Sequence, residues 1–227
     1  MSFKTIKLIN VNSERIYSFL NFIRPFIKGL STADIVIEIG CGSGYLASKL
    51  AEFHKNLQLI DIVDNRIYCR ELSFHVVNVA TTRLPFEDRS VSLIIGTQVI
   101  EHIENLTFFM NECHRILQKE GRLIVAFPNF DNINQRLRFL LKGNVVRLGG
   151  QISSGGHINF LPLKTLQYWM ENKFSLEKVD GDFTASTNYL TRLVRLFSKN
   201  TDGHVVFPTI KSPLMSYNLM AVFQKKE

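Results

Sequence analysis

The chain has few cysteines and no long apolar run. Its 227 residues include three cysteines, Cys41, Cys69 and Cys113, which are too few and too scattered for a disulfide framework or a zinc cluster. No run approaches the roughly 20 apolar residues that span a bilayer, and residues 1–4 lack the apolar stretch of a signal peptide. We therefore expect reduced thiols, no metal site and a cytoplasmic protein.

Positive charge is concentrated in the C-terminal part of the chain. Residues 1–130 hold 14 basic and 13 acidic residues, whereas residues 131–227 hold 13 and 7. This asymmetry indicates either a solvated basic face or an anionic partner for the C-terminal part, such as a membrane surface, a phosphorylated substrate or a nucleic acid.

Short β-branched segments alternate with helical patterns, which is typical of a parallel sheet with helices on both faces. Apolar residues recur at three- and four-residue spacing in the predicted helices, and Gly121 is expected to end the third of them. The predicted helices are 12–30, 45–53, 98–117 and 162–172, with Leu163, Leu166, Trp169 and Met170 facing inward in the last. The predicted strands are 34–39, 57–61, 74–79, 91–95, 122–127, 174–179 and 218–225.

A glycine-rich loop, Gly40-Cys41-Gly42-Ser43-Gly44, follows the first predicted strand and leads into a helix. Such a turn offers free backbone N–H groups and the positive end of the helix dipole to a carboxylate or phosphate. The dinucleotide fingerprint G-x-G-x-x-G requires a third glycine where Tyr45 stands. The loop therefore indicates a nucleotide-like ligand and disfavours NAD or FAD.

Extended by Glu38 and Ile39, this loop resembles the first motif, E/D-x-G-x-G-x-G, of class I S-adenosylmethionine-dependent methyltransferases. Residues 84–88, 97–105, 115–123 and 127–129 resemble further segments of the ubiquinone-biosynthesis type (type 11/23), a small-molecule branch with relatives in glycan and lipid pathways. The resemblance covers residues 35–180 and 217–225. It implies S-adenosylmethionine as cofactor and an α/β, Rossmann-like three-layer sandwich with a mostly parallel seven-stranded sheet and an antiparallel last strand. We expect one domain over 1–227, with an acceptor-side lid at 131–161 and an insertion at 182–216.

The same resemblance implies the residues that contact the cofactor. Asp61, 17 residues after Gly44, corresponds to the acid that accepts hydrogen bonds from both ribose hydroxyls, and Glu38 to the acid that organises the glycine loop and the methionine end. Where the family usually has an aspartate for the adenine amino group, this chain has Ala80, so either binding is weaker or Asn78 or the Thr81 backbone compensates. The implied set is Glu38, Gly40, Cys41, Gly42, Gly44, Asp61, Ile62, Ala80, Thr81, Gln98 and Val99.

Two histidines are candidates for a general base. Histidine titrates near neutral pH, so it suits removal of a proton from a hydroxyl acceptor. His102 lies in a segment like the family's V-x-E-H-x turn, where it either fixes the turn or acts catalytically. His157 begins a segment, His157-Ile158-Asn159-Phe160, like the family's H-x-x-F sequence near the acceptor pocket, and structural and catalytic roles are both open for it.

The acceptor is left open by the sequence. The fourth strand lacks the N-P-P-Y or D-P-P-Y tetrapeptide of base amino-group methyltransferases, and a Pro-Cys nucleophile is absent, so nucleic-acid bases are disfavoured. Residues 188–199 form a cationic amphipathic pattern that either packs on its own domain or lies on the inner face of a membrane. We expect O-methylation of a small-molecule, lipid-linked or glycan acceptor; the alternatives are an RNA methyltransferase that uses the basic region and a cofactor-binding protein without turnover.

Overall fold

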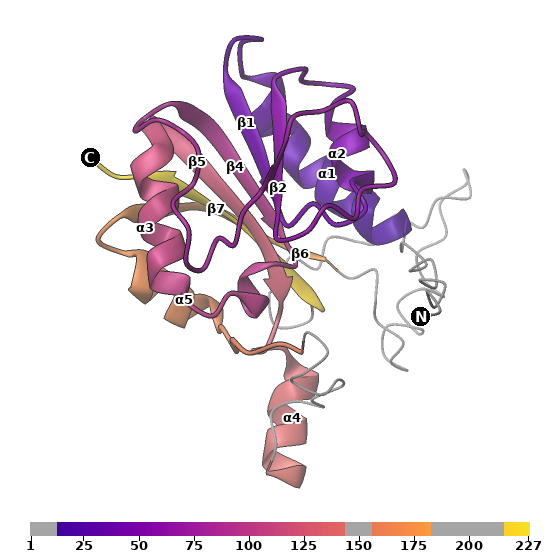
Figure 1. Cartoon of the computed structure of the whole chain (residues 1–227). Coiled ribbons are helices and arrows are strands. Elements are labelled where there is room, and N and C mark those ends of the chain that lie inside the picture. Colours follow the sequence, from indigo (N-terminus) through magenta and orange to yellow (C-terminus); the bar gives the residue numbers. More distant parts are fainter. Residues whose placement is uncertain (1–12, 144–155, 183–215) are drawn as a thin grey trace, which may run out of the picture.

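The computed structural model describes residues 13–143, 156–182 and 216–227 (Figure 1). Its centre is a seven-stranded sheet in the order β3-β2-β1-β4-β5-β7-β6. The first five strands in that order are parallel, and β7 runs antiparallel to both of its neighbours. The strands are β1 (Ile35–Ile39), β2 (Leu57–Asp61), β3 (Phe74–Val76), β4 (Val91–Thr97), β5 (Leu117–Pro128), β6 (Phe174–Asp182) and β7 (Asn218–Lys225). The predicted α/β sheet with an antiparallel last strand is confirmed.

Helices cover both faces of the sheet and create two apolar cores. On one face, α1 (Ser13–Lys28) and α2 (Tyr45–Leu50) bury side chains such as Phe19, Ile23 and Leu50. On the other face, α3 (Leu106–Ile116) and α5 (Leu163–Met170) bury side chains such as Phe109 and Leu166 (Figure 1). The central strands β1 and β4 are almost completely buried because they are covered from both sides, which explains why most of their residues are apolar.

The predicted helix over 98–117 is wrong in its first half. The segment forms a short 3-10 helix, η1 (Ile100–His102), and then α3, whose start is capped by the Asn105 side chain accepting from the Phe108 N–H at 3.0 Å. The prediction that Gly121 ends this helix is also wrong. The chain already enters β5 at Leu117, because backbone N–H groups of residues 89 and 90 satisfy the last helical carbonyls of residues 115 and 116.

Helix α5 has a narrower buried face than predicted. Leu166 and Met170 are buried and Leu163 packs against the core, but Trp169 is 56% exposed, so its predicted inward position is wrong. A helix of eight residues turns only one stripe toward the sheet, and Trp169 lies about 100° away from Met170 around the axis.

Only part of the predicted lid and insertion belongs to the described structure. Helix α4 (Ile133–Lys142) lies in the predicted lid and projects away from the sheet (Figure 1). Residues 144–155 and 183–215 lie outside the described residues, and so does the cationic pattern at 188–199. Among the described helices, none combines the length and the apolar character needed to cross a membrane.

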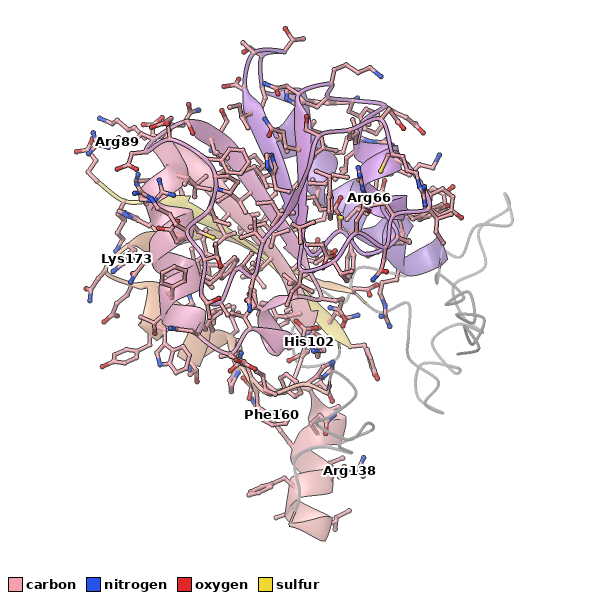
Figure 2. All side chains as sticks on the ribbon, viewed as in Figure 1. Arg66, Arg89, His102, Arg138, Phe160 and Lys173 are labelled. Atoms are coloured by element: carbon pink, nitrogen blue, oxygen red, sulfur yellow. The ribbon has the colours of Figure 1, made fainter. Side chains whose placement is uncertain are left out.

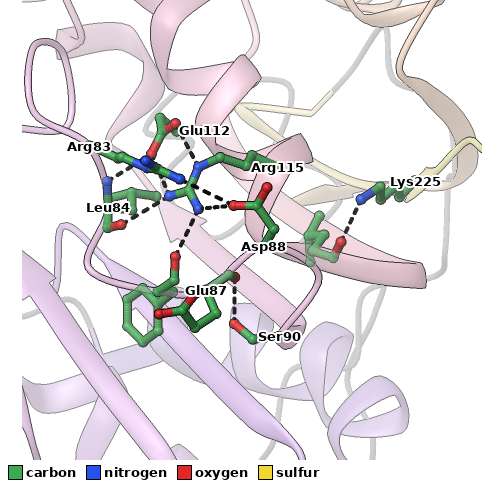
Figure 3. A network of polar contacts seen from close by, with 10 residues as sticks. Arg83, Leu84, Glu87, Asp88, Ser90, Glu112, Arg115 and Lys225 are labelled. Carbon is green, nitrogen blue, oxygen red and sulfur yellow. Dashed lines mark hydrogen bonds and ion pairs between the residues drawn. The ribbon is translucent and has the colours of Figure 1, made fainter.

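Arg115 on α3 organises the loop that follows β3 (Figure 3). Its guanidinium donates to the backbone carbonyls of Leu84 and Phe86 at 3.0 and 2.8 Å, and to Asp88 Oδ1 at 2.7 Å. It also makes two bonds to Glu112, at 2.9 and 2.8 Å, and Glu112 accepts the Leu84 N–H at 2.8 Å. The guanidinium therefore connects the loop at 84–88 to the helix that covers the sheet.

We predict that Arg115→Ala lowers the free energy of unfolding by about 3 kcal/mol, because it leaves the largely buried Glu112 carboxylate and two carbonyls without their donor. Urea unfolding followed by circular dichroism measures this. Arg83→Ala is the matched control: Arg83 pairs with the same Asp88 at 3.3 Å but is 70% exposed, so we expect a loss below about 1 kcal/mol. Equal losses in the two variants would contradict the role given to Arg115.

Candidate functional site

The glycine loop lies where the carboxyl ends of three parallel strands meet. Ile39, the last residue of β1, pairs with Ile60 of β2 and with Gly96 of β4. The Gly40 N–H then donates to the Ile60 carbonyl at 2.9 Å, which holds the start of the loop against β2. In open α/β sheets, ligands bind at this edge.

Asp61 connects the end of β2 to the glycine loop. Its Oδ2 accepts the Gly42 N–H at 2.8 Å, and its Oδ1 accepts the Ile62 N–H at 2.7 Å. A carboxylate has about four acceptor positions, so each oxygen can accept one further hydrogen bond. The arrangement therefore leaves Asp61 able to bind two hydroxyl groups of a ligand.

Gly40 and Gly42 both have a positive φ, but their surroundings differ. Gly40 has a φ of 72°, and a Cβ there would lie 2.8 Å from Val99 Cγ2. Any larger residue at position 40 would therefore clash with the chain after β4. Gly42 has a φ of 52°, and a Cβ there would meet nothing within 4 Å. The loop is thus open at Gly42, where a ligand can approach the backbone closely.

A cleft of about 350 Å³ lies beside the loop. This is at the small end of the range for ligand pockets. Its walls are mainly apolar, with Asp61, Asn78, Gln98, His102 and Glu104 as the polar side chains, and it is lined by Ile39, Gly40, Asp61, Ile62, Val77, Asn78, Val79, Ala80, Gln98, Val99, His102, Ile103 and Glu104. A nucleoside fits such a site, with an apolar space for the base and acceptors for the hydroxyls.

The structure brings about half of the predicted cofactor residues to this cleft. Gly40, Asp61, Ile62, Ala80, Gln98 and Val99 line it, and so does His102. The other predicted cofactor residues, Glu38, Cys41, Gly42, Gly44 and Thr81, are not among its lining residues. Cys41 is buried in the core under α2, where burial raises the pKa of its thiol. Sequence reasoning missed Val77 and Val79, which carry no recognisable motif. It also missed Ile103 and Glu104, although both lie in the segment 97–105 that resembles the family.

Ala80 stands where the family usually has an aspartate. The hydrogen bonds of this loop show whether Asn78 or the Thr81 backbone is free to replace that aspartate. The Thr81 N–H already donates to the Asn78 carbonyl at 3.1 Å, and the Ala80 N–H donates to Asn78 Oδ1 at 3.0 Å. The Thr81 N–H is therefore occupied, whereas the Asn78 side chain lines the cleft, and its Oδ1 keeps a second lone pair that can accept from an adenine amino group. Of the two, Asn78 is the better candidate for the adenine end.

Glu38 is a buried acid beneath the glycine loop. It is 1% exposed, and its Oε2 has no hydrogen-bond partner among the described residues. Burial, with a smaller contribution from the Asp61 charge, raises the pKa of Glu38 to about 8. The loop is thus built over an unsatisfied carboxylate oxygen that a donor from a ligand or a water molecule can satisfy. Together with the open Gly42 and the acceptor capacity of Asp61, this fits S-adenosylmethionine.

The two candidate histidines lie side by side although 55 residues separate them. Their ring centroids are 5.0 Å apart, and Phe130 contacts His157 edge-on at 6.2 Å. Burial lowers the pKa of His157, and the charge of the nearby His102 contributes to a smaller extent. Figure 2 shows His102 and Phe160 on the same side of the sheet, close to the base of α4.

Glu101 joins the histidines. It is 1% exposed, and burial raises its pKa to about 8. One donor atom from each of Glu101, His102 and His157 lies within 4.8 Å of the others. Residue spacing along the chain predicts no metal site, because His157 comes from a distant segment.

A larger cavity, of about 850 Å³, lies at the opposite end of the sheet. It is lined mainly by charged residues, among them Arg89, His114, Lys119 and Glu227, and Figure 2 shows Arg89 far from His102. No residue of the glycine loop lines this cavity. Volume alone therefore does not identify the functional site, and the cleft at the glycine loop has the ligand-binding geometry.

The fold is that of solved S-adenosylmethionine-dependent methyltransferases. A family model described as "Methyltransferase domain" matches residues 37–125, so this part of the chain is similar to that family. S-adenosylmethionine is the cofactor of this class.

Relatives and solved structures agree with this assignment. A probable S-adenosylmethionine-dependent methyltransferase of Mycobacterium tuberculosis is 34% identical over 101 residues, which are 43% of this chain and only 37% of that protein. A ubiquinone biosynthesis O-methyltransferase of Pelagibacter ubique is 21% identical and covers 70% of this chain and 74% of its own. The structure of a SAM-dependent methyltransferase from Archaeoglobus fulgidus has the same fold, with a TM-score of 0.61, 18% identity and 94% of each chain covered.

We predict that Glu38→Gln stabilises the cofactor-free protein increasingly as the pH rises. The folded-state pKa of Glu38 lies above its unfolded value, so ionisation costs stability from about pH 4.5 upward and the full cost is reached above about pH 8. The variant does not ionise, and its advantage should grow by roughly 3 kcal/mol between about pH 5 and pH 7.5. Urea unfolding at both pH values measures it. A constant difference between Glu38→Gln and wild type over this pH range would contradict the prediction.

Proposed function

We propose that this protein transfers the methyl group of S-adenosylmethionine to an oxygen of a small-molecule, lipid-linked or glycan acceptor. The observation that carries the proposal is the geometry of Asp61: both of its oxygens face donors of the loop region and keep capacity for a ribose, at a cleft that His102 also lines. Relatives named as ubiquinone biosynthesis O-methyltransferase and malonyl-[acyl-carrier protein] O-methyltransferase support oxygen as the acceptor atom.

The residues of the chain have separate tasks in this reaction. S-adenosylmethionine, when bound, supplies an electrophilic methyl group on a positively charged sulfur. Asp61 and the glycine loop hold the nucleoside, and the backbone after β4 closes the cleft through Val99 against Gly40. Such positioning can contribute roughly 7–11 kcal/mol to lowering the barrier. In the transfer, an O–CH₃ bond would form as the S–CH₃ bond breaks, and the Glu101–His102–His157 cluster would pass the hydroxyl proton to solvent.

We predict that Asp61→Asn weakens binding of both S-adenosylmethionine and S-adenosylhomocysteine by about tenfold to a hundredfold, because hydrogen bonds to a charged acceptor contribute roughly 1.5–3 kcal/mol. Isothermal titration calorimetry measures this. Glu87→Gln, an exposed acid outside the cleft, is the control and should bind like wild type. Wild-type affinity in Asp61→Asn, or no binding of either ligand to the wild type, would contradict the assignment.

Helix α4 favours a lipid-linked acceptor among the three classes. Leu140 and Leu141 are 77% and 78% exposed, and Phe139 is 56% exposed. Arg136 stands on the same helix and is also solvent-exposed. A projecting helix with exposed apolar and basic side chains is suited to the surface of an anionic membrane. We propose that it brings the cleft to acceptors at the cytoplasmic face of the membrane.

The test is a radiolabelled-methyl assay on cell extract, separated into lipid, glycan, RNA and small-molecule fractions. We expect label in the lipid fraction, and we expect Leu140→Ser plus Leu141→Ser to lower it severalfold without changing S-adenosylmethionine affinity. The matched control is Ile67→Ser plus Val63→Ser, which removes exposed apolar residues away from α4. Label in RNA would contradict the proposal, and so would intact cofactor binding with no label in any fraction.

A further inference from the structure

The cavity of about 850 Å³ at the far end of the sheet gathers cationic side chains from separate segments. Arg89 precedes β4, Lys119 lies near the start of β5, and Lys225 is the last residue of β7. Five lysine or arginine side chains line the cavity, against three acidic ones. Figure 2 shows Arg89 and Lys173 on this side of the molecule, beside α3. The volume lies within the range of small-molecule sites.

Two of the five cations are already neutralised by acids. Arg115 Nη1 lies 2.7 Å from Asp88 Oδ1. Lys119 forms an ion pair with Glu227. These two pairs use two of the three acids of the cavity, so they add no net charge to it.

The other three lining cations, Arg89, Lys225 and Lys226, face one remaining lining acid, Glu120. Lys225 Nζ donates to the Leu117 carbonyl at 2.6 Å (Figure 3), and Lys226 Nζ also donates to a backbone carbonyl, at 2.5 Å. The exposed Arg89 side chain makes no hydrogen bond or ion pair with a residue that the structure describes. Three cations against one acid leave an excess of two positive charges. An ammonium has three N–H donors and a guanidinium five, so most of these donors are unused.

The positive groups at this cavity repel one another. Burial lowers the pKa of Lys225, and the charge of Arg89 lowers it further, whereas Asp88 opposes this to a smaller extent. Burial also lowers the pKa of His114, and the charge of Lys225 acts in the same direction. Lys173 and Arg89 contribute less to this shift. An anion bound among these groups would relieve the repulsion.

The C-terminus of α3, which lies at this cavity, needs fewer cations than are present. The N–H groups of residues 89 and 90 already donate to the carbonyls of residues 115 and 116. A helix C-terminus carries about half a negative charge, which the contact of Lys225 with the Leu117 carbonyl offsets. Arg89 and Lys226 are therefore in excess of what the helix end requires.

We propose that this cavity binds the diphosphate group of a small molecule, at a site separate from the methyl-donor cleft. A diphosphate carries two or more negative charges, which matches the excess of two, and its oxygens accept hydrogen bonds from ammonium and guanidinium groups. Arg89 and Lys225 are its main partners. The volume leaves space for a group attached to the diphosphate, so the ligand is either free pyrophosphate or a nucleotide.

Binding is tested by isothermal titration calorimetry of the full chain with pyrophosphate, at low ionic strength and near-neutral pH. We expect one pyrophosphate per chain. Arg89→Gln and Lys225→Gln should each weaken binding by about tenfold or more, because each removes charge-assisted hydrogen bonds. Glu120→Gln should strengthen binding severalfold, because it removes a negative charge from the cavity.

Lys55→Gln is the matched control. Lys55 is exposed and does not line the cavity, so this variant loses the same charge elsewhere and should bind pyrophosphate like wild type. Equal weakening in Lys55→Gln and Arg89→Gln would show a general effect of net charge and overturn the site. Absence of pyrophosphate binding to the wild type would overturn it as well.

Two measurements on the wild type separate this site from the glycine loop, which can also bind an anion. Saturating S-adenosylhomocysteine should leave the pyrophosphate affinity unchanged, and competition between the two ligands would overturn the proposal. Hydrogen–deuterium exchange should show protection by pyrophosphate at residues 86–90 and 114–120, and protection at residues 40–44 instead would overturn it. Because neither measurement involves methyl transfer, the site can fail or succeed independently of the proposed function.

ADP and a short single-stranded RNA identify the source of the phosphate groups. Tighter binding of ADP than of pyrophosphate would support a nucleotide as the ligand, and equal affinities would support recognition of the diphosphate alone. Tighter binding of the RNA than of either would overturn the assignment to a small molecule.

Discussion

The hydrogen bond from the Gly42 N–H to Asp61 Oδ2 is the interaction on which the site depends. It joins the loop after β1 to the end of β2, and the parallel pairing of these strands brings the two residues together across 19 positions of sequence. The bond fixes one carboxylate oxygen while leaving acceptor capacity for a ligand. It also places the loop over Glu38. Burial of this carboxyl group is unfavourable in the ligand-free protein, and a bound ligand can satisfy it.

Much of the fold could be predicted because the buried strands of the sheet are also the apolar segments of the sequence. The strands around residues 34–39 and 57–61 are short and apolar, and a glycine loop or an acid marks the ends of both. The helix over 98–117 was predicted wrongly because its apolar period continues across Ile103, whereas Asn105 caps a new helix there. Trp169 was placed inside by the same kind of periodicity, although a short helix buries a narrower face.

The candidate site was predictable only as far as it follows from consecutive residues. Gly40, Asp61 and Val99 belong to motifs and do line the cleft. The grouping of Glu101 with His157 depends instead on backbone hydrogen bonds between η1 and residues 158–159, which no spacing in the sequence encodes. The occupied Thr81 N–H is likewise a property of the loop conformation, and it leaves Asn78 as the residue to examine at the adenine end.

A crystal structure of the chain with S-adenosylhomocysteine tests the central claim most directly. The account predicts that both ribose hydroxyls donate to Asp61, that the ligand backbone passes over Gly42, and that the adenine lies among the apolar residues near Ala80. Ligand density in the larger charged cavity at the other end of the sheet, or a ribose without contact to Asp61, would contradict it.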